Sequence, residues 1–379
     1  MKIVVGIDAS RSRSGGAFAH LIGILNAGNI EEHGIKAVHV WSHNKMLNLL
    51  PQNDWILKHS SSFLEMNLFA QVFWQIFVFP YLAKRTGCDI ILNTSAATFS
   101  RFKPSVTMSR EALSYEANEM KRYGLSFARI RLLLLKVIQN SSLRSAEGCT
   151  FLTNYIADLI QQSTGSLTNY RVIPHGVGDE FRRPSKRIWP RDGKGIRVTY
   201  VSNIAPYKHQ WHVVRAISRL RKKGFDLILI LAGGTDGGRA QALLDQAIND
   251  CDPDLKFVNQ IGHINNSELP ALLSDSNLFL FASSCETISN TLLESMASGL
   301  PVACSNRGPM PEVLQDAGVY FDPEDPLSIS DAVESLLNNT KLREVSEQRV
   351  LDLSSKYSWQ RCANETWSFL RETYDSQNS

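Results

Sequence analysis

Short apolar segments alternate with longer amphipathic segments along the 379-residue chain. The apolar runs have the length of buried strands, and the stretches between them repeat apolar residues at helical spacing. Strands that alternate with helices predict parallel sheets covered by helices on both faces. The expected strands are 3–7, 37–41, 90–93, 106–109, 150–153 and 172–174 in a first sheet, and 198–202, 227–232, 256–258, 278–282, 302–305 and 319–321 in a second. The expected helices are 16–27, 64–85, 116–140, 208–223, 238–249, 289–298, 328–338 and 358–374.

The boundary between the two sheets is predicted from a change in composition. Residues 182–195 are polar, charged and rich in Pro and Gly, which is typical of a domain junction. We therefore expect a first domain over 1–180, a linker over 181–195 and a second domain over 196–355, a division that the chain length readily allows. Doubly wound sheets bind ligands at the carboxyl ends of their strands. A cleft between the two sets of strand ends is the expected ligand site.

Composition places the chain among soluble globular proteins, with 43% hydrophobic and 20% charged residues. Its six cysteines have neither paired nor metal-type spacing, which favours a reducing, cytoplasmic compartment. The N-terminal MKIVVGID has the pattern of a buried strand and not that of a signal peptide. No uncharged apolar run reaches the length of about 18 residues that a spanning helix needs, so we expect no membrane span.

Charge is distributed unevenly along the chain. Residues 1–178 hold 18 Lys+Arg and 11 Asp+Glu, whereas residues 179–379 hold 22 and 26. A basic N-terminal half suggests an anionic acceptor or a peripheral attachment to a membrane surface, and ordinary solvated charge is the alternative. Segments 68–79 and 121–144 combine aromatic or apolar residues with helical spacing. They are either surface helices that lie on a membrane or core helices with a basic edge.

The most informative motif is SSCETISNTLLESMASGLPVACS, residues 283–305. Glu286 lies on a loop after a strand, and Glu294 follows after seven intervening residues, inside the next helix. Ser289 or Asn290 can cap that helix, and Gly299 occupies the position of a C′ glycine. A helix N-terminus is a ready site for phosphate. A carboxylate on each side of it is suited to hydroxyls flanking a diphosphate, as in a sugar nucleotide.

This motif closely resembles the Glu-x7-Glu signature of the family-4 retaining glycosyltransferases, which have the GT-B fold. Four further segments resemble parts of that family in matching order: SGGAFAHL (14–21) its N-terminal glycine loop, IPHGVGDEF (173–181) its interdomain segment, YVSNIAPYKHQ (200–210) its diphosphate loop, and RGPMPEVLQDAGVYFDP (307–323) the stretch after the two glutamates. The resemblance implies two Rossmann-like domains that face each other across a cleft. It also implies a last helix, within 356–379, that crosses back onto the first domain.

The resemblance also implies roles for individual residues. Lys208 would contact the β-phosphate of the donor, Glu286 the hydroxyls of the sugar, and Glu294 those of the ribose. Gly15 and Gly16 would permit close approach of the backbone to phosphate or sugar, and Gly262 with His263 would line the base pocket. For each of these, a plain structural role is the alternative. The full expected donor-binding set is Gly15, Gly16, Asn203, Lys208, Gly262, His263, Glu286, Ile288, Ser289, Asn290, Thr291 and Glu294, with Glu286, Lys208 and Arg110 as the catalytic group.

Two positions depart from the family pattern. Asn203 stands where the family usually has an arginine, and Arg307 is either its replacement or a surface residue. Arg110 and Glu111 stand where many members have a His-Asp pair. A guanidinium stays protonated and is no base, so Arg110 would bind an anionic group, polarise the sugar, or pair with a neighbouring carboxylate such as Glu111 or Glu116.

The resemblance implies a retaining glycosyltransferase that moves a sugar from a nucleoside diphosphate sugar to a hydroxyl of a glycan or lipid-linked saccharide, in cell-surface polysaccharide synthesis. We expect no metal and no cofactor, because the histidines form no ligand cluster and no Asp-x-Asp motif is present. A degenerate GT-B protein that binds without turnover is the main alternative, and a sugar-nucleotide epimerase is a second. The lack of G-x-G-x-x-G after the first strand disfavours a nicotinamide dehydrogenase.

Overall fold

The computed structural model describes residues 2–12, 15–182, 189–190, 194–235 and 237–378. The chain forms two compact units. The first runs to Gly176 and includes the residues from Ser358 onward, and the second is Val177–Tyr357. Parts of the linker expected over 181–195, namely 183–188 and 191–193, lie outside the described residues.

The first unit is built on a seven-stranded parallel sheet with the order β3-β2-β1-β4-β5-β6-β7. β1 pairs with β2 on one side and with β4 on the other, so the sheet winds in opposite directions from its centre. The strands are β1 (Ile3–Asp8), β2 (Ile35–Trp41), β3 (Ile56–His59), β4 (Ile90–Asn93), β5 (Ser105–Met108), β6 (Gly148–Phe151) and β7 (Tyr170–Val172).

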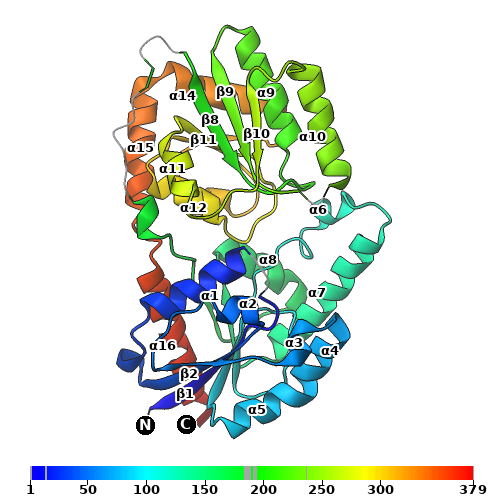
Figure 1. Cartoon of the computed structure of the whole chain (residues 1–379), viewed down its shortest axis with the longest axis vertical. Helices are drawn as coiled ribbons and strands as arrows, with labels where there is room; N and C mark the ends of the chain where they lie inside the picture. The colour runs from blue at the N-terminus through cyan, green and yellow to red at the C-terminus, as the bar shows by residue number, and fades with distance from the viewer. Residues whose placement is uncertain (1, 13–14, 183–188, 191–193, 236, 379) are drawn as a thin grey trace. The chain divides into compact units, whose positions relative to one another are not determined.

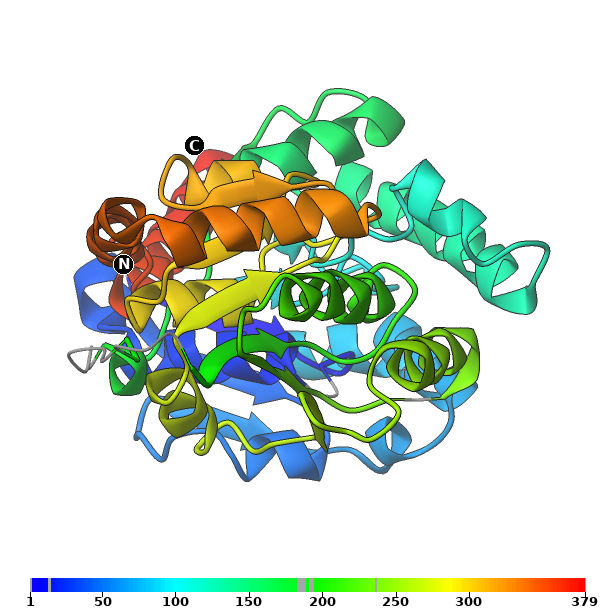
Figure 2. The ribbon, with the colours of Figure 1, turned by 90° about the horizontal axis from the view of Figure 1, so that it is seen from above.

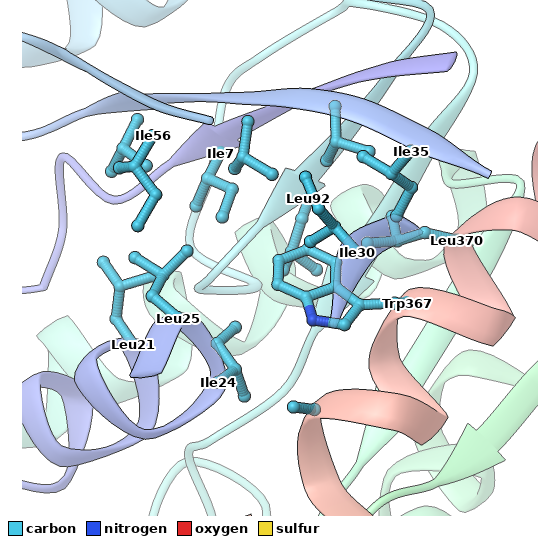
Figure 3. Packing of buried hydrophobic residues seen from close by; sticks show 14 of the residues in the cluster. Ile7, Leu21, Ile24, Leu25, Ile30, Ile35, Ile56, Leu92, Trp367 and Leu370 are labelled. Atoms are coloured by element: carbon cyan, nitrogen blue, oxygen red, sulfur yellow. The ribbon is translucent and has the colours of Figure 1, made fainter. Parts of the chain in front are cut away.

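Helices cover both faces of this sheet (Figure 1). One face carries α1 (Gly16–Ala27), α2 (Asn44–Leu47) and α16 (Trp359–Asn378) over a core that includes Ile7, Leu25 and Trp367 (Figure 3). Gly23 and Gly28 let α16 approach α1, since a Cβ at either would lie 2.3 Å from the ring of Trp359 or Trp367. The remaining helical segments are η1 (Ile30–His33), α3 (Ser62–Glu65), α4 (Leu68–Phe73), the π-helical turn η2 (Trp74–Val78), α5 (Phe79–Arg85), α6 (Ala117–Lys121), α7 (Phe127–Ser145) and α8 (Asn154–Thr164).

The second unit has a six-stranded parallel sheet with the order β10-β9-β8-β11-β12-β13. Its winding also reverses at the centre, between β8 and β11, which pair through Leu278 and Val198. The strands are β8 (Ile196–Val201), β9 (Leu227–Ala232), β10 (Val258–Gly262), β11 (Leu278–Phe281), β12 (Val302–Ser305) and β13 (Val319–Phe321). The expected two-domain, doubly wound α/β architecture is thus confirmed.

In the second unit, α9 (Gln210–Lys222) packs between α10 (Gly238–Cys251) and α14 (Pro326–Asn338), a row that Figure 2 shows from above. α12 (Asn290–Ala297) packs against α15 (Thr340–Ser354). The shorter helices are η3 (Asp179–Phe181), α11 (Leu269–Ser274) and α13 (Met310–Leu314). No helix in the described part of the chain is both long and apolar enough to cross a membrane.

The structure differs from the expected elements mainly where a long helix was predicted. The stretch 64–85 is divided into α3, α4, η2 and α5, and 116–140 is divided into α6 and α7 around Gly124, whose φ is 58°. Gly124 lies within the break between α6 and α7, where a left-handed residue interrupts the ladder of backbone hydrogen bonds. β3, α8, α11 and α15 were not predicted. The segments of β3 and α11 are short and that of α15 is largely polar, whereas α8 has apolar residues at helical spacing that the sequence analysis missed.

Candidate functional site

The candidate site of the second unit lies where its sheet reverses direction. The loop after β8 carries Lys208, and the loop after β11 carries Glu286. Because β8 and β11 are neighbours in a parallel sheet, their carboxyl ends lie at the same edge. In open α/β sheets, ligands bind outside the carboxyl ends of strands at such a switch point.

Lys208 and Glu286 form an ion pair between the Nζ and Oε1 atoms. Their side chains are only 9% and 15% exposed, so solvent screens the pair weakly. The Lys208 ammonium also lies 5.3 Å from the ring centre of Tyr207 and 5.6 Å from that of Phe281. Two aromatic faces and one carboxylate therefore hold the cation at the strand ends.

The backbone around Lys208 is fixed by several hydrogen bonds. The Lys208 N–H donates to the Ala205 carbonyl at 3.0 Å, and the buried Tyr200 hydroxyl donates to the Lys208 carbonyl at 2.7 Å. The Ser284 N–H donates to the Tyr207 carbonyl at 2.9 Å and so ties this loop to the one that carries Glu286. These contacts position both partners of the ion pair before any ligand arrives.

Helix α12 begins directly after this loop. The Ser289 Oγ atom caps it by accepting the Leu292 N–H at 3.2 Å, which confirms one of the two predicted caps. The Thr291 hydroxyl donates to the Val201 carbonyl at 3.1 Å and anchors the helix start to the end of β8. Ile288 is buried, and Asn290 is the first residue of the helix. The first-turn N–H groups thus open at the edge that holds Lys208.

The carboxyl group of Glu294 has no hydrogen-bond partner for its buried Oε2 atom. Burial, with a further contribution from the nearby Glu180 carboxylate, raises the pKa of Glu294 to about 8. A buried acceptor without a partner costs free energy, and a hydroxyl-bearing ligand would supply the missing donor. Glu180 was missed by the sequence analysis, because nothing in the pattern links it to a helix more than one hundred residues later.

Four other candidate residues lie at exposed or partly exposed positions, and their contacts do not by themselves indicate a ligand site. Asn203 is exposed, and its carbonyl accepts a hydrogen bond from the Gln210 side chain at 3.0 Å. The Gly262 carbonyl accepts the Gly233 N–H at 2.7 Å, and His263 is exposed beyond it. Arg307 pairs with Asp322 at 2.9 Å. The ion pair commits the Arg307 guanidinium, which favours the surface role over a replacement for the missing arginine.

Gly15, Gly16 and Arg110 lie in the first unit, at the corresponding reversal of its sheet. Gly15, with a φ of 57°, begins α1, and its carbonyl accepts the Phe18 N–H at 3.0 Å. Arg110 follows β5, and its Nη2 lies 3.4 Å from the Ser12 Oγ. Burial lowers the pKa of Arg110 to about 10, which still leaves it charged at neutral pH. The nearby Glu111 carboxylate partly offsets this lowering of the Arg110 pKa, so the two side chains interact electrostatically.

The sequence analysis did not identify a pair of histidines near Arg110, His20 and His175. His20 is fully buried on α1, and its ring stacks on that of His175 at 5.0 Å. Neither ring nitrogen of His20 has a hydrogen-bond partner. Burial, together with His175 and Arg110, lowers the pKa of His20 well below its usual value. His20 is therefore a neutral side chain near a half-buried cation.

The segment that holds this site is similar to a known protein family. The family model described as glycosyl transferases group 1 matches residues 181–350, the region that holds Lys208, Glu286 and Glu294. We call the matched residues 181–350 the group 1 segment.

Relatives of the group 1 segment are partial matches. O-antigen chain mannosyltransferase B of Escherichia coli is 33% identical over 110 residues, which is 29% of this chain and 29% of that protein. Glycogen synthase of Mycobacterium tuberculosis is 29% identical over 206 residues, or 53% of this chain and 48% of that protein. The chain thus spans about half or less of the length of these curated relatives.

Solved structures share the fold over nearly the whole chain. Sucrose-phosphate synthase from Thermosynechococcus elongatus superposes with a TM-score of 0.79 at 15% identity, covering 99% of this chain and 100% of that one. Anabaena HepE, solved in complex with UDP and glucose, gives 0.72 at 16% identity, with coverage of 99% and 100%. The chain therefore has the GT-B fold.

Proposed function

We propose that this protein is a retaining glycosyltransferase. It would transfer a sugar from a nucleoside diphosphate sugar to a hydroxyl of a glycan or lipid-linked saccharide. The observation that carries the proposal is the Lys208–Glu286 ion pair at the switch point, beside the N-terminus of α12. A cation, a carboxylate and a helix N-terminus at one strand edge suit a ligand with both a diphosphate and hydroxyl groups.

Each group has a separate task in the proposed reaction. The bond between the sugar C1 and the diphosphate oxygen breaks, and C1 forms a bond to the acceptor oxygen, whose proton passes to the departing diphosphate. Lys208 and the N–H groups that open α12 stabilise the negative charge on the leaving group, a type of electrostatic contribution that is often the largest in catalysis. Glu286 holds hydroxyls of the sugar. Retention of configuration follows from the family resemblance.

The buried carboxyl of Glu294 would bind the ribose hydroxyls. A ribose offers two neighbouring O–H groups, and the two oxygens of a carboxyl group can bond to both of them. The unpartnered Oε2 atom supports this role. In the first unit, a Cβ at Gly15 would meet nothing within 4 Å, which leaves room for close approach of a ligand to the backbone at Gly15 and Gly16. The charge of Arg110 is suited to an anionic group on the acceptor or the sugar.

We propose that the reaction proceeds without a metal ion, because Lys208 and the helix N-terminus supply the positive charge that a diphosphate needs. Addition of EDTA should then leave the rate unchanged. Among the described residues, no group of three or more His, Cys, Asp or Glu side chains is arranged to hold a metal ion.

The class of acceptor is proposed from the relatives. The mannosyltransferase from Escherichia coli is named for the O-antigen chain, and another relative is named as a mannosyltransferase acting on phosphatidylinositol monomannoside. A role in cytoplasmic assembly of cell-surface polysaccharide or glycolipid fits these names.

The test is a thermal-shift screen of the full chain against UDP, GDP, dTDP and ADP sugars, followed by donor hydrolysis and transfer assays with the donor that binds. The expected result is that one donor binds and is turned over, and that Lys208→Ala lowers this turnover by about 10²–10³. Donor binding without hydrolysis or transfer would instead indicate a GT-B protein that has lost its catalytic activity.

A further inference from the structure

The largest group of exposed apolar side chains lies in two segments of the first unit, residues 66–81 and 125–137. They hold twelve of the nineteen large hydrophobic side chains that are exposed in the described chain. Phe69 is 85% exposed, Phe127 is 81% exposed and Leu125 is fully exposed. Exposed apolar groups of this size mark a surface that is covered in use. We call these two segments the apolar surface.

Both segments present their apolar residues in stripes. On α7, Phe127, Ile130, Leu134 and Val137 are spaced three or four positions apart, which aligns them along one side of the helix. From α4 to α5, the exposed Phe69, Phe73, Phe77 and Tyr81 follow at every fourth position. The structure therefore excludes the interpretation of α7 as a core helix with only a basic edge.

The two stripes lie on the same face of the first sheet. α5 leads from β3 to β4, and α7 leads from β5 to β6, so both crossovers run in the same direction along the strand order. Right-handed crossovers in one direction place their helices on one face. Figure 1 shows α4, α5 and α7 on this side of the sheet and α1 and α16 on the other.

The basic excess of the N-terminal half falls in the same region. Residues 66–145 contain 11 Lys+Arg and 4 Asp+Glu, and neither 66–81 nor 125–145 contains any acidic residue. Exposed Arg131 lies on α7, and exposed Lys84 and Arg85 end α5. An apolar stripe with basic residues beside it is the pattern of a helix that lies on an anionic lipid surface.

We propose that the first unit docks on an anionic membrane through the apolar surface, with the exposed side chains of α4, η2, α5 and α7 inserted at the level of the lipid headgroups. A second copy of this chain is the poorer occupant, because a two-fold interface would place one basic region against its equal. The proposal would bring the enzyme to a lipid-linked acceptor, but it does not depend on catalysis.

The test is co-sedimentation of the full chain with vesicles of phosphatidylcholine alone or mixed with phosphatidylglycerol. We expect binding to the mixed vesicles that falls as salt is added. The double variants Phe69→Ser/Phe77→Ser and Leu125→Ser/Phe127→Ser should each reduce partitioning at least tenfold, the scale of two large apolar side chains left in water. Arg131→Gln should reduce it about fivefold, as expected for one basic residue near the surface.

Leu255→Ser is the matched control, since Leu255 is 68% exposed but belongs to the second unit. Its partitioning should equal that of the unsubstituted chain. The proposal would be overturned if the chain did not bind the mixed vesicles, or if the two double variants bound them as well as the control does. Concentration-dependent dimers that the two double variants abolish would also overturn the proposal, because the apolar surface would then be an interface between copies of this chain. The two double variants should bind the sugar-nucleotide donor as well as the unsubstituted chain does. A failure of membrane docking can therefore be told apart from a failure of the proposed function.

Discussion

Lys208 and Glu286 are 78 positions apart in the chain, and the structure joins them in an ion pair at the ends of two neighbouring strands. A salt bridge this little exposed gains strength from its surroundings, yet each charge has lost most of its hydration. Such a pair is costly to keep for stability alone. Its place at the switch point of the sheet accounts for its presence better, because the proposed sugar-nucleotide donor would use both charges.

Replacement of Lys208 by alanine should lower kcat/KM by about 10²–10³, the effect of removing one preorganised charge contact to the leaving group. Steady-state kinetics with a defined donor measure this. Lys223→Ala is the control, since Lys223 also pairs with a carboxylate, Glu334, but at the surface. A Lys208→Ala rate within a fewfold of the control would refute the diphosphate role.

The same substitution should also destabilise the second unit by about 3–5 kcal/mol, because it leaves the carboxylate of Glu286 buried and unpaired. The double variant Lys208→Met/Glu286→Gln removes both charges and should recover most of that stability, without recovering activity. Urea unfolding of the two variants separates the effects. Recovery of activity along with stability would mean that the pair is only structural.

Glu294 should make the stability of the second unit depend on pH. Its pKa is raised from 4.5 to about 8, so the folded state binds more protons than the unfolded state between these values. The free energy of unfolding therefore falls as pH rises through this window, by on the order of 3 kcal/mol at pH 7. Glu294→Gln should remove this slope and be more stable than the unsubstituted chain near the upper end of the window. If the free energy of urea unfolding changed with pH equally in Glu294→Gln and in the unsubstituted chain, the raised pKa of Glu294 would be contradicted.

Glu294→Ala should in addition weaken donor binding by about 10–100-fold, the scale of two lost hydrogen bonds to the ribose. Titration calorimetry with the donor measures it, and Glu344→Ala, an exposed position on α15, is the control. Unchanged donor affinity would exclude contact with the ribose.

Asn203→Arg should tighten donor binding by about fivefold, because it returns a guanidinium to the position where the family usually carries one and an arginine binds diphosphate in a bidentate manner. Asn203 is exposed, so the larger side chain has room. The donor Kd of this variant should fall while that of Arg307→Gln stays constant. A Kd that is the same in both variants would place position 203 outside the diphosphate site.

His20→Leu should make the first unit less sensitive to acid. The folded pKa of His20 lies well below 6.5, whereas the unfolded chain takes up its proton near that value. Stability that is present above about pH 6.5 is therefore lost as pH falls below it, and leucine removes that loss. At neutral pH the variant should be no less stable, because two unpartnered ring nitrogens leave the core with the histidine. Thermal unfolding at mildly acidic and neutral pH would show both effects.

The sequence predicted those parts of the fold and site that depend on local pattern. The strands that end at Ala232 and Ser305, the helix from Gly16 and the cap at Ser289 were expected within a residue or two, because periodicity and capping chemistry are local. The ion pair of Lys208 with Glu286, the proximity of Glu180 to Glu294 and the buried state of His20 depend on which loops the sheet brings together. Local pattern carries no information on such distant contacts.

The last helix, α16, has a consequence for how the chain is made. Trp367 and Leu370 belong to the core of the first unit, whose strands are all translated before Gly176. During synthesis the first unit therefore waits, with the part of its core that α16 covers still exposed, until α16 leaves the ribosome. The second unit is continuous in sequence and has every element it needs earlier. We expect the usual N-to-C order of domain folding to be reversed here, with the second unit complete before the unit that precedes it.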